Sequence, residues 1–386
     1  MENNHFRTLI LVSFAWLLIF VGRITPSTLL VQMTNDLHMS DFQAGVALSG
    51  IWFFYGVLQF PSGVFADALG RKKIIVFSLI GFSIASILIG LSNSFIIAGV
   101  TFCLIGMASG LLPSPSFTLI AELFGSKKGK ALGIHSSIGS ISGFIPIILP
   151  ILAVSFGWRN IFFLWGIIGI ILAYSIFIFA DESLKNPEYI SYITRLKEMI
   201  KSIGNREILF MFLINIAISI VWMGILSWFP SYIQQDKGFR PEIAGLLFSI
   251  VLSGGLILKP VIGHLSDKTN RFNILTVLIF MTALSVFLLP VSSSLPLLII
   301  VSLLFSQTAA FYPVRTSYLM DIWPSSTSAA NLGAFRSMII LIGSPISTIM
   351  GWARENYGFD IVLYVLASSL LLTGLIMLFK IRKIKQ

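Results

Sequence analysis

Long apolar stretches alternate with short polar ones along the whole chain. A helix needs about 20 apolar residues to cross the roughly 30 Å hydrocarbon core of a membrane. Twelve stretches are long enough, at residues 8–30, 42–65, 74–92, 95–120, 131–153, 159–180, 207–230, 242–264, 274–291, 296–320, 332–352 and 359–380. The pattern therefore predicts an all-α membrane protein with twelve transmembrane helices.

The composition supports this reading of the pattern. Hydrophobic residues make up 56% of the chain and charged residues 11%, and the mean hydropathy is +0.92. A soluble protein has about 25% charged residues, so the apolar surface of this chain needs lipid. No small-residue cleavage site follows the first apolar stretch, so we expect the first helix to be retained rather than cleaved as a signal peptide.

The net charge of +10 could indicate nucleic-acid binding, but the positions of the charges favour membrane orientation instead. With both termini in the cytoplasm, the inner segments hold eighteen Lys and Arg residues and the outer loops hold four, Arg159, Lys237, Arg240 and Arg354. Cytoplasmic loops carry such an excess. We therefore expect a multi-pass protein of the cell membrane, with both termini cytoplasmic and no nucleic-acid partner.

The polar segment between the second and third apolar stretches carries closely spaced charges. It reads GVFADALGRKK from Gly63 to Lys73 and contains Asp67, Gly70 and Arg71. Asp67 lies one helical turn before Arg71, close enough for the carboxylate to pair with the guanidinium. The segment resembles the loop between helices 2 and 3 of the major facilitator superfamily, whose pattern is G-x-x-x-D-x-x-G-R-basic-basic.

A second, degenerate copy of this segment, GHLSDKTNRFN, lies 200 residues downstream. Six identities share that offset: Gly63, Asp67 and Arg71 recur as Gly263, Asp267 and Arg271, and Ala44, Gly45 and Ser49 recur as Ala244, Gly245 and Ser249. A fixed offset indicates an internal repeat, although two coincidental turns remain an alternative. With the resemblance, the repeat predicts two pseudo-symmetric six-helix bundles.

We place the two bundles at residues 1–180 and 207–386, joined by a linker at 181–206. The linker contains five Lys and Arg residues, and its apolar residues recur at helical spacing. This spacing predicts an amphipathic helix on the inner membrane surface. A partner-binding segment is the alternative.

The resemblance also implies a charge cluster at the inner face. In the family, an acidic residue at the end of helix 4 joins the Asp and Arg of the loop, and Glu122 fits that role beside Asp67 and Arg71. Asp321 fits it in the second half, beside Asp267 and Arg271. We expect the first cluster to hold the halves together when the cavity opens outward and to separate when it opens inward. Solvated carboxylates at helix ends are the alternative reading.

Several kinds of chemistry find no support in the sequence. There is no phosphate-binding loop G-x-x-x-x-G-K-[ST], so ATP is not the expected energy source. Cys103 is the single cysteine, and no cluster of His and Cys suggests a metal. We expect a secondary transporter with no catalytic residues, no cofactor and no metal, rather than an enzyme.

A cation near the middle of a membrane span is the main candidate for chemistry. Arg23 lies about three residues, or about 4.5 Å, from the centre of the first span. A charge there costs about 2.5–3.5 kcal/mol even on the lenient insertion scale, and no carboxylate lies near the middle of any span. A guanidinium fork suits a carboxylate or phosphate, so Arg23 is the predicted substrate counter-ion. Alternatively, Arg23 donates to backbone carbonyls freed around Pro26.

The resemblance implies a cavity lined by helices 1, 4, 7 and 10. Arg315 on the tenth span could reach this cavity or extend to the membrane interface. We add Asn215, Trp222 and Tyr312 on the seventh and tenth spans as further substrate-binding candidates. For the aromatic run of residues 52–55, which covers a full helical turn, packing and lipid contact are the expected role.

The predicted function is import or exchange of a small organic or inorganic anion by a monomer whose partners are that substrate and the bilayer. The segment WFPSYI at residues 228–233 resembles organic-anion and sugar-phosphate members. The alternative is export of drugs or metabolites. The fifth span has a loose form of the glycine-proline motif of drug/proton antiporters, but Phe144 replaces the proline after its last glycine. A receptor that transports nothing is a third reading.

Overall fold

The computed structural model describes residues 2–59, 61–182, 197, 205–323 and 328–385. Within these residues the chain is helical almost throughout and forms no β-strand. The predicted linker helix lies mostly outside the described residues, and the domain boundaries at 180 and 207 stay predictions.

The helical elements before the linker form the first group. They are α1 (Glu2–Thr28), α2 (Leu30–Asp36), α3 (Asp41–Gln59), α4 (Pro61–Leu69), α5 (Arg71–Gly90), α6 (Phe95–Leu111), α7 (Pro113–Phe124), the 3-10 helix η1 (Gly125–Lys127), α8 (Lys128–Ser140), the 3-10 helix η2 (Ile141–Ile147), α9 (Leu149–Phe156) and α10 (Trp158–Phe179).

The helices after the linker form the second group. They are α12 (Arg206–Gln235), α13 (Pro241–Ser253), α14 (Gly255–Lys268), α15 (Arg271–Leu288), α16 (Leu295–Ser306), α17 (Thr308–Ile322), α18 (Ser328–Gly343), α19 (Ile346–Tyr357) and α20 (Phe359–Lys385).

Several predicted spans appear as two or three consecutive elements because prolines interrupt them. Pro113 stands at the start of α7, Pro146 lies inside η2, and Pro150 stands in the first turn of α9. A proline nitrogen cannot donate a helical hydrogen bond, and its ring clashes with the preceding turn. The helix therefore bends at these sites within one crossing of the membrane.

Ten helical stretches of the described chain are long and apolar enough to cross a membrane, and α3 with α4 makes an eleventh. One of the ten runs for 53 residues from Phe95 to Ile147, about 80 Å of straight helix and more than twice the hydrocarbon core. The chain turns back within it, because Gly125 has a φ of +52° and α7 packs against α8. This stretch crosses twice, so the predicted all-α fold with twelve crossings is confirmed.

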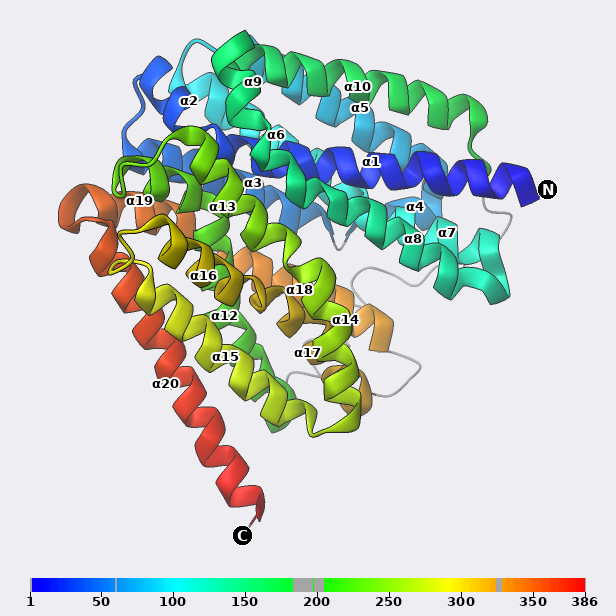
Figure 1. Ribbon diagram of the computed structural model, residues 1–386. Coiled ribbons are helices and arrows are strands. Elements are labelled where there is room, and N and C mark those ends of the chain that lie inside the picture. The colour runs from blue at the N-terminus through cyan, green and yellow to red at the C-terminus, as the bar shows by residue number, and fades with distance from the viewer. Residues whose placement is uncertain (1, 60, 183–196, 198–204, 324–327, 386) are drawn as a thin grey trace.

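The two groups form the arms of a V in Figure 1, meeting near α3, α13 and α19 and diverging toward the chain termini. At the closed end, α3 packs against α19, and α13 packs against η2 and α9. We name it the Arg354 end, after a residue of α19. At the other end, the extensive contacts of α4, α7 and α8 lie within the first group, and those of α14 and α17 within the second. We name that end the Arg71 end.

Large apolar side chains remain exposed on both groups. Phe77 is 64% exposed and Phe379 is 68% exposed. Water would make such surfaces costly, whereas lipid tails accept them without penalty. The exposed apolar surface therefore fits a protein embedded in a bilayer.

Candidate functional site

Arg23 lies buried on α1 inside a cage of aromatic rings. Its guanidinium carbon lies 4.3 Å from the centre of the Tyr55 ring, 5.0 Å from Phe20 and 5.6 Å from Trp52. The residue is only 5% exposed, and its Nε atom has no hydrogen-bond partner within the described residues. The rings present their negative faces to the cation, but they do not neutralise it.

The described chain provides no carboxylate partner for Arg23 and no backbone carbonyl that accepts from it. The predicted alternative, in which Arg23 donates to carbonyls near Pro26, is therefore not what the structure shows, and α1 continues through Pro26 to Thr28. Trp52 and Tyr55 stand three residues apart on one face of α3, whereas Phe53 points away and is 44% exposed. We expected mainly packing from this run and missed its contact with Arg23.

Arg315 is the second buried cation, and it lies in the second group. It is 2% exposed, and its Nη1 atom donates to Asn215 Oδ1 at 3.0 Å. Its guanidinium carbon lies 5.6 Å from the Tyr312 ring centre and 5.5 Å from that of Phe335. The sequence allowed Arg315 either to reach the cavity or to extend to the membrane interface. Its burial excludes extension to the interface.

Four of the five predicted substrate-binding residues lie together on α12 and α17. Trp222 packs edge-to-face on Tyr312, with ring centres 6.2 Å apart, and Tyr312 in turn lies beside Arg315, the partner of Asn215. Arg23 stands apart on α1, which packs against α12. The candidate site thus has one buried guanidinium in each group of helices.

The Arg71 cluster, formed by Asp67, Arg71 and Glu122, has the predicted geometry. Arg71 Nη2 lies 2.8 Å from Glu122 and 3.3 Å from Asp67. The cluster joins the α4–α5 turn to the end of α7. Gly70 has a φ of +100°, a conformation that favours glycine.

Three further contacts fix the turn that carries the Arg71 cluster. The Lys72 backbone N–H donates to both carboxylate oxygens of Glu182 at 3.2 Å, and Lys72 Nζ donates to the Ala180 carbonyl at 2.7 Å. A Cβ on Gly63 would lie 2.9 Å from Ser114 Oγ, so Gly63 lets α4 approach α7 closely. These contacts tie the turn to the end of α10 and to α7.

The Arg271 cluster, formed by Asp267, Arg271 and Asp321, repeats the arrangement in the second group but is more open. Arg271 pairs with Asp267 at 2.8 Å and also with Asp321. The Asp267 and Asp321 side chains are 64% and 61% exposed, against 16% for Glu122. The two carboxylates raise the pKa of Arg271 above its ordinary value. A Cβ on Gly263 would meet nothing within 4 Å, so this copy is packed more loosely.

The residues of each cluster come from one group of helices. We expected the Arg71 cluster to separate in a molecule open at this end. Instead its pairs are intact although the groups diverge here. All three residues of this cluster belong to the first group. Their role in holding the two halves together stays a prediction.

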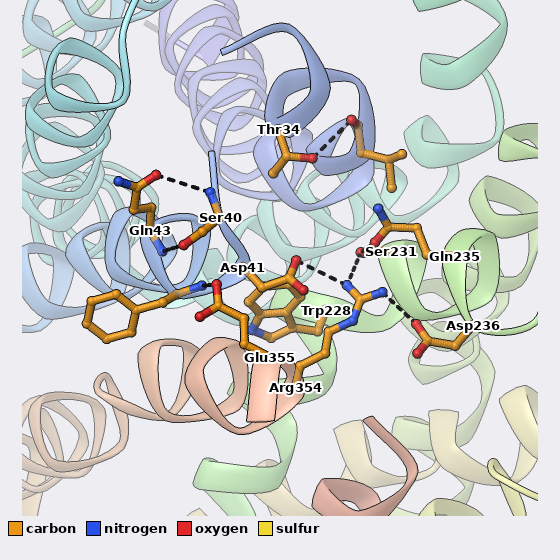
Figure 2. Close-up of polar contacts among 12 residues, drawn as sticks. Thr34, Ser40, Asp41, Gln43, Trp228, Ser231, Gln235, Asp236, Arg354 and Glu355 are labelled. Atoms are coloured by element: carbon orange, nitrogen blue, oxygen red, sulfur yellow. Dashed lines mark hydrogen bonds and ion pairs between the residues drawn. The ribbon is translucent and has the colours of Figure 1, made fainter. Parts of the chain in front are cut away.

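An ion bridge that we did not predict joins the groups at the opposite end. Arg354 of α19 donates to Asp236 at 2.7 Å, to Ser231 at 3.0 Å and to Asp41 at 3.4 Å. Figure 2 shows the guanidinium between the two carboxylates, and its carbon lies 5.9 Å from the centre of the Trp228 ring. We call these four polar residues, Asp41, Ser231, Asp236 and Arg354, the Arg354 bridge. Asp41 comes from the first group and the other three from the second.

The repeated pair Gly45 and Gly245 lies at the same closed end. A Cβ on Gly45 would lie 2.4 Å from the Ser347 carbonyl oxygen, and a Cβ on Gly245 would lie 2.2 Å from that of Pro146. Each glycine therefore permits close contact with the opposite group. Ser49 adds a hydrogen bond across the same contact, accepting from the Thr348 N–H at 3.0 Å. At Gly45 and Gly245 the repeat at offset 200 thus marks equivalent contacts across the two groups.

Comparison with known proteins places the chain in a family. The family model described as Major Facilitator Superfamily matches residues 12–347 and 211–386. The multidrug resistance protein MdtG of Escherichia coli strain K12 is 27% identical over 338 residues, which are 85% of this chain and 82% of that protein.

Solved structures of transporters share the fold. The nucleoside transporter NupG, solved as a point mutant, superposes with a TM-score of 0.85 at 13% identity, covering 97% of this chain and 99% of that one. An inward-facing bacterial homolog of the human lysosomal transporter Spinster gives a TM-score of 0.78 at 16% identity, covering 98% and 96%. At these identities the likeness concerns the fold alone.

Proposed function

Because the chain belongs to the major facilitator superfamily, and is therefore a multi-pass membrane transporter rather than an enzyme, we propose that it moves a small organic or inorganic anion across the cell membrane. The transport is secondary and proceeds by alternating access. The proposed working unit is a monomer in the lipid bilayer.

One observation carries the proposal: the guanidinium of Arg23 is buried without a counter-ion among the described residues. Removing a charge from water costs several kcal/mol. Cation–π contacts return about 0.5–2 kcal/mol each, and the described residues supply no carboxylate. Ionisable groups within the membrane are retained where they serve a function. An anionic substrate bound to Arg23 supplies the missing charge.

Arg315 extends the argument to the other group of helices. It too is buried, and its hydrogen-bond partners within the described residues are the adjacent Thr316 and the neutral amide of Asn215. In the proposed site Arg23 is the principal counter-ion, while Arg315, Asn215, Tyr312 and Trp222 bind the substrate from the second group. A substrate held by both groups couples its own binding to their relative motion.

The conformation fits one step of such a cycle. The groups pack at the Arg354 end and diverge at the Arg71 end. The excess of Lys and Arg at the Arg71 end favours a cytoplasmic position for that end. On this orientation the molecule is closed to the outside and open to the cytoplasm.

Transport by Arg23 variants tests the proposal. Arg23→Lys keeps the charge but loses the planar fork, and we expect affinity to fall about 10- to 100-fold, because hydrogen bonds to charged groups contribute about 1.5–3 kcal/mol. Arg23→Ala should abolish anion uptake into proteoliposomes. Arg240→Ala is the control, since its side chain is 82% exposed. Full anion transport by Arg23→Ala would contradict the proposal.

Export of drugs or metabolites is the second candidate function. The similarity to the multidrug resistance protein MdtG favours it. A neutral or cationic drug has no need of a guanidinium, so its transport should survive in Arg23→Ala. The same variant therefore separates the two functions.

A further inference from the structure

Arg354 already has a carboxylate partner within its own group of helices. Asp236 and Ser231 both belong to α12 and its C-terminal end, and they accept from Arg354 at 2.7 Å and 3.0 Å. This pair does not depend on contact between the groups. Asp41, at 3.4 Å, is the longer contact and is the one residue of the bridge that the first group brings. Closure of the Arg354 end thus adds a carboxylate to a pair that is already neutral.

Negative charge exceeds positive charge around Asp41. Arg354 and Glu355 act on Asp41 itself, and Lys237 and Asp360 act on Asp236, which shares Arg354 with Asp41. Lys237 donates through Nζ to the Pro290 carbonyl at 2.5 Å, and its charge lowers the pKa of Asp236 rather than that of Asp41. Glu355 accepts from the Phe42 N–H at 2.7 Å. Arg354 is therefore the one cation that contacts Asp41 in the described structure.

These carboxyls are largely withdrawn from water in the closed structure. The Asp41 and Asp236 side chains are 29% and 27% exposed. Burial is the main cause that raises the pKa of both groups above the ordinary value, and Arg354 offsets it only in part. Asp36 provides the contrast on the same surface. Arg159 and Trp158 of the same group hold its pKa below the ordinary value.

We propose that Asp41 takes up a proton from the external solution when the Arg354 end closes, and that it releases the proton when this end opens. The proton forms an O–H bond on the carboxyl oxygen that does not face Arg354, and the other oxygen still accepts from Arg354. Uptake removes the surplus negative charge that closure would bury. The inference rests on the proposed orientation, with the Arg354 end outside, but does not depend on the substrate.

The sign of the pH effect follows from linkage. A carboxyl whose pKa is higher in the closed state than in the solvated open state binds its proton more tightly when closed. Acid therefore favours closure, and the effect is confined to the range between the ordinary carboxyl pKa of about 4 and the raised one. Within that range, each rise of one pH unit lowers the ratio of closed to open molecules by up to tenfold.

Distance measurement between the two groups tests the proposal. Asn93 and Ser293 lie in exposed turns, after α5 and α15 respectively. Spin labels on Asn93→Cys and Ser293→Cys, in a Cys103→Ser background, report the separation of the Arg354 ends in lipid nanodiscs without substrate. We expect the short-distance population to grow as pH falls from 7 to 4.

Two variants identify the group responsible. Asp41→Asn mimics the protonated acid, so it should be closed over the whole range with no pH dependence. Asp36→Asn is the matched control and should titrate like the unmodified protein. A pH-independent distance in the unmodified protein, or an unchanged titration in Asp41→Asn, would overturn the proposal. Anion transport by Arg23→Ala would remove the proposed substrate class and leave this result standing.

Discussion

Alanine in place of Gly45 or of Gly245 should weaken the closure of the Arg354 end. In the closed structure, a Cβ on Gly45 would lie 2.4 Å from the Ser347 oxygen, and one on Gly245 would lie 2.2 Å from the Pro146 oxygen. Both obstacles are backbone atoms of the opposite group, so no side-chain rotation relieves them. The helices must separate by about 1 Å to restore ordinary van der Waals contact.

The size of the effect follows from the cost of overpacking. Forcing extra atoms into a packed contact costs about 1–3 kcal/mol. This cost applies to the closed state alone, because the glycines no longer face the other group once the ends separate. The closed population should therefore fall by a factor of about 5 to 150 relative to the open one. The gain in helix propensity on replacing glycine is shared by both states and cancels.

The distance between labels at positions 93 and 293 measures this shift directly. Gly45→Ala and Gly245→Ala should each increase the long-distance population. Gly133→Ala is the matched control, because a Cβ there meets nothing within 4 Å. If both interface variants keep the distance distribution of the unmodified protein, then Gly45 and Gly245 are not required for closure of the Arg354 end.

Two further predictions concern the charges at the Arg71 end. Glu122→Gln should lower the melting temperature more than Asp321→Asn does. Breaking a buried ion pair costs about 3–5 kcal/mol, whereas an exposed pair contributes about 0–1 kcal/mol. Equal melting temperatures in the two variants would show that the difference in burial has no consequence. A reporter that is active only outside the cytoplasm, fused after residue 386, should stay silent, and activity there would reverse the proposed orientation.

The fold was predictable because the membrane imposes a strong constraint on the sequence. A crossing helix must be apolar over about 20 residues, so hydropathy alone located the crossings, including the pair that the structure joins without a break between Phe95 and Ile147. The Arg71 cluster was also accessible. Asp67 and Arg71 are one turn apart, and the resemblance supplied Glu122.

Contacts between distant parts of the chain were not accessible in the same way. Asp41 and Arg354 are 313 residues apart, and their pairing depends on which helices pack together. The sequence showed the repeated Gly45 and Gly245 without their reason, which is the approach of backbone atoms from the opposite group. Periodicity could not select Trp52 and Tyr55 either, because the aromatic run 52–55 covers every face of α3.

The most direct test of the central claim is a ligand-stabilisation screen of the purified protein and its Arg23→Lys variant against anion and drug libraries. An anion that binds the folded protein at 100 times its Kd stabilises it by about 2.7 kcal/mol. If Arg23 binds an anionic substrate, anions should raise the melting temperature of the unmodified protein, and Arg23→Lys should lose most of this shift. Stabilisation by neutral or cationic drugs, equal in both proteins and without any response to anions, would show that Arg23 is not the counter-ion of the substrate.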